Sequence, residues 1–164
     1  TLVNNALTGM TKKHFHKISP SVFQDSFHLN VLTTLQITQQ AILSFRKRKF
    51  GKVITILTSY LANNPPTGLS EYVANKAYLK SMSTSWASEN AAYNITSNCI
   101  SPSMMLTQLT RDLDERVVEE IINAQPLGRL VTPEEVADAV AFLTVATQQI
   151  NGINMLVNGG ADVI

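Results

Sequence analysis

The sequence VITILT at residues 53–58 is a short run of apolar and β-branched side chains. Such a run, without alternating polar residues, is typical of a strand that is buried on both faces of a parallel sheet. Residues 59–68 follow as a loop, which is marked by Pro65, Pro66 and Gly68. The run therefore predicts a buried parallel strand whose carboxyl end opens into a loop.

Helices are predicted on both sides of this strand. Apolar residues at helical spacing extend from Ser21 to Lys49, and a second helix is predicted from Ser70 to about Tyr93. Further short apolar runs predict strands at residues 2–3, 94–100 and 153–157. This alternation predicts an α/β fold, a Rossmann-like doubly wound parallel sheet with helices on both faces.

Two segments separate the last two predicted strands. Residues 103–125 are predicted as a mostly helical excursion, and the sequence Thr-Pro-Glu-Glu at residues 132–135 predicts the start of a helix that runs to about Thr147. In sheets of this type, ligands bind beyond the carboxyl ends of the strands. Those ends lead here into residues 4–6, Ser59 and residues 102–103.

The composition is that of an ordinary globular protein and predicts a single domain over residues 1–164. Hydrophobic residues make up 45% and charged residues 15% of the 164. The formal net charge of +1 gives no reason to expect nucleic acid or a membrane as partner. The basic cluster at residues 46–49 is interpreted as a solvated helix end, where cations complement the helix dipole, in preference to a polyanion site.

The cysteine and histidine content points to a reducing compartment and away from a metal site. A single cysteine, Cys99, excludes an intrachain disulfide, and we expect a cytoplasmic protein in which it fills a small space in the core. His14 and His16 have no third ligand at a useful spacing, so no metal is expected.

Tyr72 and Lys76 are the first candidates for chemistry. They are four residues apart in a predicted helix, so their side chains share a face. A free tyrosine titrates near about pH 10, and a nearby ammonium favours the phenolate. The spacing therefore predicts a lowered pKa for Tyr72 and a role as general acid or base.

Ser59 and Asn30 are further candidates for a site that includes Tyr72 and Lys76. The Tyr-x-x-x-Lys spacing alone is weak, a serine after a strand is ordinary turn chemistry, and a helical asparagine is usually exposed. Ser59, however, closes the strand before the Tyr72 helix, and Asn30 lies inside the preceding helix, where its propensity is unfavourable. The order of the four residues along the chain favours a functional hypothesis.

The order and spacing of these residues resemble the short-chain dehydrogenase/reductase family, near the 3-oxoacyl-acyl-carrier-protein reductases. Asn30, Ser59, Tyr72 and Lys76 match the catalytic tetrad of that family. Further segments match its Asn-Asn-Ala-Gly strand end, its Pro-Gly-x-x-x-Thr segment and its closing strand with a glycine pair, here residues 2–6, 102–107 and 151–160. The resemblance covers essentially the whole chain.

The resemblance implies an NAD- or NADP-dependent oxidoreductase that interconverts a ketone and a secondary alcohol. Tyr72 would exchange a proton with the substrate oxygen, Ser59 would steady that oxygen, Lys76 would hydrogen-bond the nicotinamide ribose, and Asn30 would hold a water that relays protons. Hydride transfer belongs to the cofactor. The implied cofactor-binding residues are Asn5, Ala6, Tyr72, Lys76, Pro102, Ser103, Met105 and Thr107.

Three departures from the family pattern stand out. Leu7 and Ser103 replace glycines, which is tolerable if the backbone there keeps negative φ. The glycine-rich half that binds the pyrophosphate is also missing, which predicts that only the contiguous strands 4-5-6-7 of the family's sheet are present and that the parent protein is longer. The strand at residues 2–3 would then lie at a bare sheet edge.

Two other hypotheses remain open. The chain could be a non-catalytic, reductase-like module for oligomerisation, since its two long helices match those that form dimer and tetramer contacts in the family. It could also resemble a nucleotide-sugar epimerase, although the closing strand argues against this. A small-molecule or carrier-bound carbonyl substrate is expected under a lid at residues 103–125, whose apolar wall would include Met104, Met105 and Leu109.

Overall fold

The central feature of the fold is a parallel sheet. The computed structural model describes residues 1–7, 9–62, 64–108, 110 and 113–162. Within these residues, β1 (Leu2–Asn4), β2 (Gly51–Ile56), β3 (Ile95–Pro102) and β4 (Asn154–Val157) form one sheet in the order β1-β2-β3-β4, with all neighbours parallel. The predicted Rossmann-like half sheet is confirmed, and β1 lies at one edge of it.

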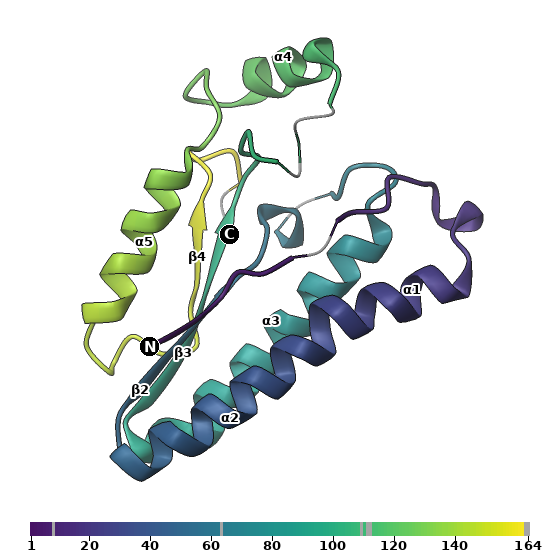
Figure 1. Ribbon diagram of the computed structural model, residues 1–164. Coiled ribbons are helices and arrows are strands. Elements are labelled where there is room, and N and C mark those ends of the chain that lie inside the picture. Colours follow the sequence, from purple (N-terminus) through teal and green to yellow (C-terminus); the bar gives the residue numbers. More distant parts are fainter. Residues whose placement is uncertain (8, 63, 109, 111–112, 163–164) are drawn as a thin grey trace.

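Helices cover both faces of this sheet. The first predicted helix consists of α1 (Pro20–Phe27), a π-helical turn (His28–Leu32) and α2 (Thr33–Arg48), and it lies beside α3 (Ser70–Asn90) on one face (Figure 1). The opposite face is covered by α5 (Pro133–Val145). This arrangement is the doubly wound architecture that the alternation of elements predicted.

Apolar side chains fill both layers between sheet and helices. On the α5 side, Ile54 and Ile100 pack against Leu143, and each of the three is at most 1% exposed. On the other side two clusters join the sheet to α2 and α3, and their buried members are Val31, Leu57, Leu79 and Cys99, and Phe45, Val53, Trp86 and Ile95. Cys99 therefore is the small core residue that its apolar surroundings predicted.

The helix boundaries follow local signals. Thr132 Oγ1 accepts the N–H of Glu135 at 3.3 Å, and Glu135 Oε2 accepts the N–H of Thr132 at 2.9 Å, which is the predicted capping arrangement at the start of α5. The 103–125 segment is less helical than predicted, since within it only α4 (Glu115–Ala124) is an α-helix among the described residues. Short 3-10 turns lie at Phe15–Lys17, Ser59–Leu61 and Ala91–Tyr93.

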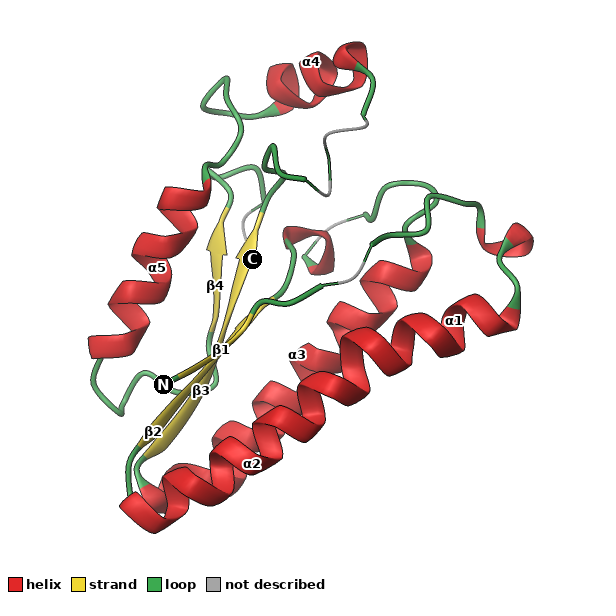
Figure 2. Cartoon of the chain, viewed as in Figure 1, coloured by secondary structure: helices red, strands yellow, loops and turns green. Residues whose placement is uncertain are grey.

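The end of β3 differs from the prediction. Pro102 was expected to end the strand, but it is the last strand residue, and the chain continues with an N–H bond from Ser103 to the carbonyl of Val157 at 3.0 Å. A proline is tolerated there because the strand ends at this point. Figure 2 shows that long loops gather around the carboxyl ends of the strands, the end at which sites are expected in such sheets.

One negative finding bears on localisation. Among the described residues, no helix is both long enough and apolar enough to cross a lipid bilayer.

Candidate active site

The candidate site begins where β2 ends. Leu57 extends the strand by one residue, since its N–H bonds the carbonyl of Ile100 at 2.7 Å. Thr58 keeps an extended backbone, and its hydroxyl accepts the N–H of Tyr60 at 3.4 Å, which caps the 3-10 turn that starts at Ser59. Thr58 and Ser59 are 5% and 3% exposed. Two adjacent hydroxyl-bearing residues are thus buried at the carboxyl end of a central strand.

The first turns of α3 bring Tyr72 and Lys76 to the same place. The Tyr72 phenol lies near the Thr58 side chain, whose influence lowers the pKa of the phenol. Lys76 Nζ donates to the carbonyl of Ile56, the last residue of β2, at 2.7 Å, and it lies 5.9 Å from the centre of the Tyr72 ring. The structure therefore places Ser59, Tyr72 and Lys76 around the end of β2, as their order in the sequence predicted.

The electrostatics of this pair differ from the expectation. Burial raises the pKa of the Tyr72 phenol above its usual value; the hydrogen bond from Thr58 lowers it, and the nearby Tyr60 raises it. Burial also lowers the pKa of the Lys76 ammonium to about 8. The prediction of a lowered pKa for Tyr72 is wrong for this structure, because removal of the phenol from water is the largest effect on its pKa and raises it.

Asn30 lies in the π-helical turn between α1 and α2 and is 4% exposed. Its Nδ2 donates to Ser26 Oγ at 3.1 Å, and Asn75 Nδ2 donates to the same oxygen at 2.8 Å. The turn explains why an asparagine is tolerated in a long helix: one extra residue per turn locally changes the backbone bonding, a feature frequent at functional sites. Asn30 is thereby linked to α3, the helix of Tyr72 and Lys76.

Glu71 completes this polar cluster. It is 2% exposed, and its Oε1 accepts bonds from Ser26 Oγ and, at 3.0 Å, from Asn75 Nδ2. Burial raises the pKa of the carboxyl group, while a bond from the backbone of Thr11 lowers it. Glu71 and Asn75 form an i, i+4 row on α3 beside the Tyr72 and Lys76 row, so one row fastens the helix to α1 and the other faces the end of β2.

The predicted cofactor contacts at the end of β1 are exposed. Asn5 and Ala6 both lie at the surface. The preceding Asn4 is instead the residue that holds the strand end, since its Nδ2 donates to Thr38 Oγ1 at 3.0 Å and to Thr55 Oγ1 at 3.5 Å. Asn4 thus ties β1 to α2 and β2, and leaves Asn5 and Ala6 free to meet a ligand.

The end of β3 carries the other predicted cofactor contacts. Ser103 Oγ is buried and has no hydrogen-bond partner among the described residues, a condition shared by the hydroxyls of Ser70 and Thr96. Met105 packs on the core beneath α5, and the N–H of Thr107 donates to Thr110 Oγ1 at 2.9 Å. A buried hydroxyl without a hydrogen-bond partner costs free energy.

The remaining expectations for this segment concern backbone and apolar contacts. Positive φ outside glycine occurs at Lys49 and Asn94 within the described residues, so Leu7 and Ser103 keep the negative φ that their lack of glycine requires. Met104 is partly buried, and Leu109 lies outside the described residues.

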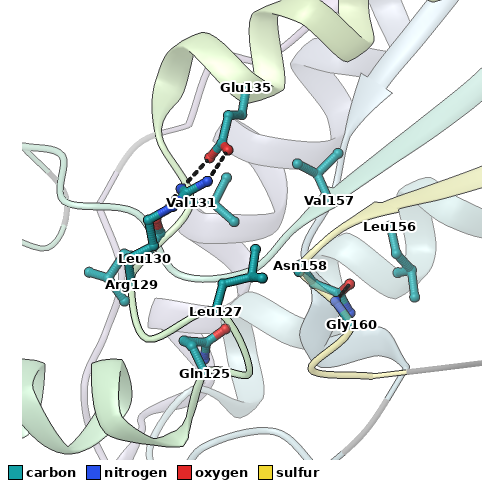
Figure 3. A pocket seen from close by; sticks show the side chains of 11 residues that line it. Gln125, Leu127, Arg129, Leu130, Val131, Glu135, Leu156, Val157, Asn158 and Gly160 are labelled. Carbon is teal, nitrogen blue, oxygen red and sulfur yellow. Dashed lines mark hydrogen bonds and ion pairs between the residues drawn. The ribbon is translucent and has the colours of Figure 1, made fainter.

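Two further features lie away from the tetrad. Among the described residues, no group of three histidines, cysteines or carboxylates could hold a metal ion. A cavity of about 290 Å³ opens beyond β4, where Arg129 and Glu135 form a two-bond ion pair of 2.6 and 3.0 Å (Figure 3). That pair, with a bond from the Thr132 backbone, lowers the pKa of Glu135 to about 2. The pair braces the start of α5.

Three residues of this region were missed in the sequence. Thr58 was treated only as the end of a strand, Asn4 only as part of a motif, and Glu71 only as a helix-start signal. Asn4 and Glu71 bond segments far away in the sequence, so spacing gave no signal for them. Only Thr58 had a local clue, because it precedes Ser59 and is itself a hydroxyl residue.

Comparison with known proteins places the chain in a family. The family model described as enoyl-(acyl carrier protein) reductase matches residues 1–162. The chain is 35% identical over 162 residues to acetoacetyl-CoA reductase of Shinella zoogloeoides, covering 97% of this chain and 66% of that protein. It is 32% identical over 161 residues to 3-oxoacyl-[acyl-carrier-protein] reductase of Aquifex aeolicus, covering 97% and 64%. The chain thus spans slightly less than two thirds of these relatives.

Solved structures agree on the fold. The chain superposes with a TM-score of 0.90 on a 3-ketoacyl-(acyl-carrier-protein) reductase from Brucella melitensis complexed with NADH, at 24% identity, covering 99% of this chain and 67% of that one. A gluconate 5-dehydrogenase from Burkholderia cenocepacia in complex with NADP and tartrate gives the same TM-score and identity, covering 98% and 63%. Together with the family model, these findings show that the chain belongs to the short-chain dehydrogenase/reductase family.

Proposed function

We propose that this chain carries the proton-transfer site of an NAD- or NADP-dependent oxidoreductase that interconverts a ketone and a secondary alcohol. The observation that carries the proposal is the placement of Tyr72 and Lys76 one turn apart on α3, with Lys76 Nζ 2.7 Å from the Ile56 carbonyl at the end of β2 and 5.9 Å from the centre of the Tyr72 ring. Relatives named acetoacetyl-CoA reductase and 3-oxoacyl-[acyl-carrier-protein] reductase support a 3-oxoacyl thioester as the substrate class.

The raised pKa of Tyr72 supports the reductive direction. A phenol is protonated at neutral pH at its ordinary pKa of about 10, and burial moves the pKa of Tyr72 further in that direction, so Tyr72 holds a proton that it can donate to a carbonyl oxygen. Ser59 would donate a hydrogen bond to the same oxygen as charge develops there. Alcohol oxidation needs the phenolate, so the same site would oxidise the alcohol faster at alkaline pH than at neutral pH.

The chain offers several groups to the cofactor, which supplies the hydride when it is bound. The Lys76 ammonium has three N–H donors. One of them bonds the carbonyl of Ile56, so two could bond ribose hydroxyls. The Ser103 hydroxyl, which has no partner among the described residues, is a second group that could bond the cofactor. Asn30 would support Lys76 through an ordered water. The proposed cofactor contacts are Asn5, Ala6, Tyr72, Lys76, Pro102, Ser103, Met105 and Thr107.

The test is a turnover assay of the complete gene product that contains these residues. Acetoacetyl-CoA and a panel of other ketones are offered with NADH or NADPH, and loss of cofactor absorbance is followed. We expect Tyr72→Phe to lower kcat by about 10²–10⁴, the usual contribution of a general acid. Tyr78→Phe, on an exposed part of the same helix, is the matched control. Equal turnover by wild type and Tyr72→Phe contradicts the proposal.

A second candidate function is a module for self-association. Leu29, Ile37 and Leu43 on the α1–α2 helix and Tyr78 on α3 are each more than 40% exposed although apolar. Such a face is typical of an interaction surface. Sedimentation of wild type against Ile37→Glu tests it: a dimer or tetramer that dissociates in the variant supports self-association, and an unchanged species contradicts it.

A further inference from the structure

A strongly basic segment, residues 12–17, lies in the loop between β1 and α1. Its charged and titratable members are three lysines and two histidines: Lys12, Lys13, Lys17, His14 and His16. All six residues of the segment are exposed, and no carboxylate precedes Asp25 in the chain. Among the described residues, none of the three lysines forms an ion pair. The basic segment therefore presents positive charge that no side-chain carboxylate of the described chain neutralises by contact.

The backbone holds the basic segment in a defined place. The N–H of Lys13 donates to the carbonyl of Gly68 at 3.2 Å, which fastens the segment to the turn before α3. The 3-10 turn Phe15–Lys17 follows, and buried Ile18 closes it with a bond of 3.1 Å from its N–H to the carbonyl of Phe15. Figure 1 shows this part of the chain passing beside the start of α3. The positive charge thus lies at the same end of the sheet as the candidate site.

Phe15 adds an aromatic surface in the middle of this charge. Its side chain is 70% exposed, and its ring contacts that of Phe23 edge to face, with 5.9 Å between the ring centres. The contact orients the Phe15 ring while most of the ring stays open to solvent. Exposed aromatic rings stack on nucleobases, and lysine ammonium groups bind phosphates. An aromatic ring flanked by lysines is therefore suited to an adenine nucleotide.

The size of the basic segment and the charges beside it favour a small ligand on its outer face. A stable protein–protein interface takes about 20–30 residues a side, far more than this segment offers. A cavity of about 290 Å³ lies between the segment and α3, and its lining includes Thr11, Asp25 and Glu71. The carboxyl groups of Asp25 and Glu71 disfavour a phosphate in that cavity. A phosphate would therefore bind the exposed lysines.

We propose that the basic segment binds the nucleotide end of coenzyme A when the substrate is an acyl-CoA: its three lysines bind the phosphates, and Phe15 stacks on the adenine. This inference rests on the proposed function, because it assigns a surface to the carrier of a 3-oxoacyl thioester. The pantetheine chain of coenzyme A joins the nucleotide to the thioester. The nucleotide can therefore bind at the edge of the site while the ketone meets Tyr72.

The first experiment measures binding without turnover. The complete gene product is saturated with NADH or NADPH, so that the dinucleotide site is filled, and it is titrated in a calorimeter with adenosine 3′,5′-bisphosphate. We expect binding that the triple variant Lys12→Gln/Lys13→Gln/Lys17→Gln weakens about tenfold. The matched control, Lys47→Gln/Arg48→Gln/Lys49→Gln, removes equal charge before the opposite end of β2 and is expected to keep the affinity.

Phe15 is tested in the same titration. Phe15→Ala removes the stacking surface and is expected to weaken binding of the bisphosphate about fivefold, whereas Phe15→Tyr keeps the ring and the affinity. Equal affinities of Phe15→Ala and wild type would contradict stacking on the adenine.

Kinetics with two thioesters test the same surface in the reaction. Acetoacetyl-CoA and acetoacetyl-pantetheine share the reacting ketone, but only the first carries the nucleotide. We expect the triple lysine variant to raise KM for acetoacetyl-CoA about tenfold with little change in kcat, and to leave KM for acetoacetyl-pantetheine in place. Added salt is expected to raise the wild-type KM for acetoacetyl-CoA more than that of the variant.

Several results overturn the inference. They are absence of bisphosphate binding to the wild type, equal weakening in the two triple variants, and an equal rise of KM for both thioesters. An effect confined to an acetoacetyl group on acyl carrier protein would assign the segment to a protein partner and would also contradict the proposal. Because the calorimetric titration needs no turnover, binding can be found in a protein that reduces no ketone, and it can be absent from an active reductase. Failure of this inference and failure of the proposed function are therefore distinguishable.

Discussion

The ends of β2 and β3 are neighbours in the sheet, but the hydroxyl side chains that follow them differ in whether they have a hydrogen-bond partner. At the end of β2, the Thr58 hydroxyl accepts the N–H of Tyr60 at 3.4 Å. At the end of β3, the Ser103 hydroxyl is buried without a partner among the described residues. A buried polar group without a partner costs about 1–3 kcal/mol, so the hydroxyl at the end of β3 carries a cost that the hydroxyl at the end of β2 avoids.

The same contrast holds on either side of the site. The helix that carries Tyr72 and Lys76 is fastened by the cluster of Ser26, Asn30, Glu71 and Asn75, whose members bond one another. On the side of β1, Asn5 and Ala6 lie at the surface. The side with the proposed proton-transfer residues is therefore held by internal hydrogen bonds, whereas the proposed cofactor residues Asn5 and Ala6 are exposed.

Among the variants that compare the two strand ends, the largest effect is expected at Ser59. Ser59→Ala removes the hydroxyl proposed to stabilise the substrate oxygen, and loss of one such donor costs about 10²–10³ in kcat. Steady-state kinetics of the complete gene product measure this. Ser103→Ala is the matched serine variant after the next strand, and we expect it to leave kcat nearly unchanged at saturating cofactor. Equal losses of kcat in Ser59→Ala and Ser103→Ala would contradict the proposed difference between the two strand ends.

Most of the framework was predictable because it depends on local patterns. Short β-branched runs gave the strands, and the capping sequence at residues 132–135 gave the start of α5. The π-helical turn at Asn30 was not predictable, since one extra residue in a turn hardly alters the apolar spacing of a long helix. More helix was predicted at residues 103–125 than the structure contains, because the apolar residues of this segment do not keep a regular helical spacing.

The candidate site was predictable in its members but not in its electrostatics. The order of Asn30, Ser59, Tyr72 and Lys76 indicated residues that could meet at one strand end. Their spacing contains no information on how much water surrounds them, and burial decides the direction of the pKa shift of Tyr72. The cluster around Glu71 joins segments more than forty positions apart, which no local pattern reports.

The next largest effect concerns Lys76. Its pKa is lowered from 10.5 to about 8 by burial, so between about pH 8 and 10.5 the unfolded chain binds a proton that the folded chain has lost. The free energy of unfolding contributed by this group therefore rises with pH across that window, by at most about 3 kcal/mol.

Urea unfolding of wild type and Lys76→Met at several pH values isolates this contribution. We expect the difference, wild type minus variant, to increase from pH 8 to pH 10.5, whereas Lys80→Met, four residues further along α3, shows no such increase. A difference that does not change with pH would mean that Lys76 is not desolvated. Lys76 would then not belong to the buried part of the site.

A smaller effect is expected from the polar cluster. Ser26→Ala removes a hydroxyl that donates to Glu71 and accepts from Asn30 and Asn75, and a loss of about 1–3 kcal/mol in the free energy of unfolding follows from weakening these buried groups. Ser21→Ala, an exposed serine on the same helix, is the control. Equal stabilities of the two variants would show that the cluster does not fasten α3 to α1.

The smallest effect on stability is expected at Ser103, and it tests the other half of the comparison. Because the hydroxyl has no partner among the described residues, Ser103→Ala removes no internal bond, and the free energy of unfolding should stay within about 0.5 kcal/mol of wild type or rise. If the hydroxyl bonds the cofactor, the same variant weakens binding of NADH or NADPH about five- to tenfold in calorimetric titration of the complete gene product. A variant that loses stability but keeps its affinity for the cofactor would show that Ser103 has a structural role, like Thr58, and does not bond the cofactor.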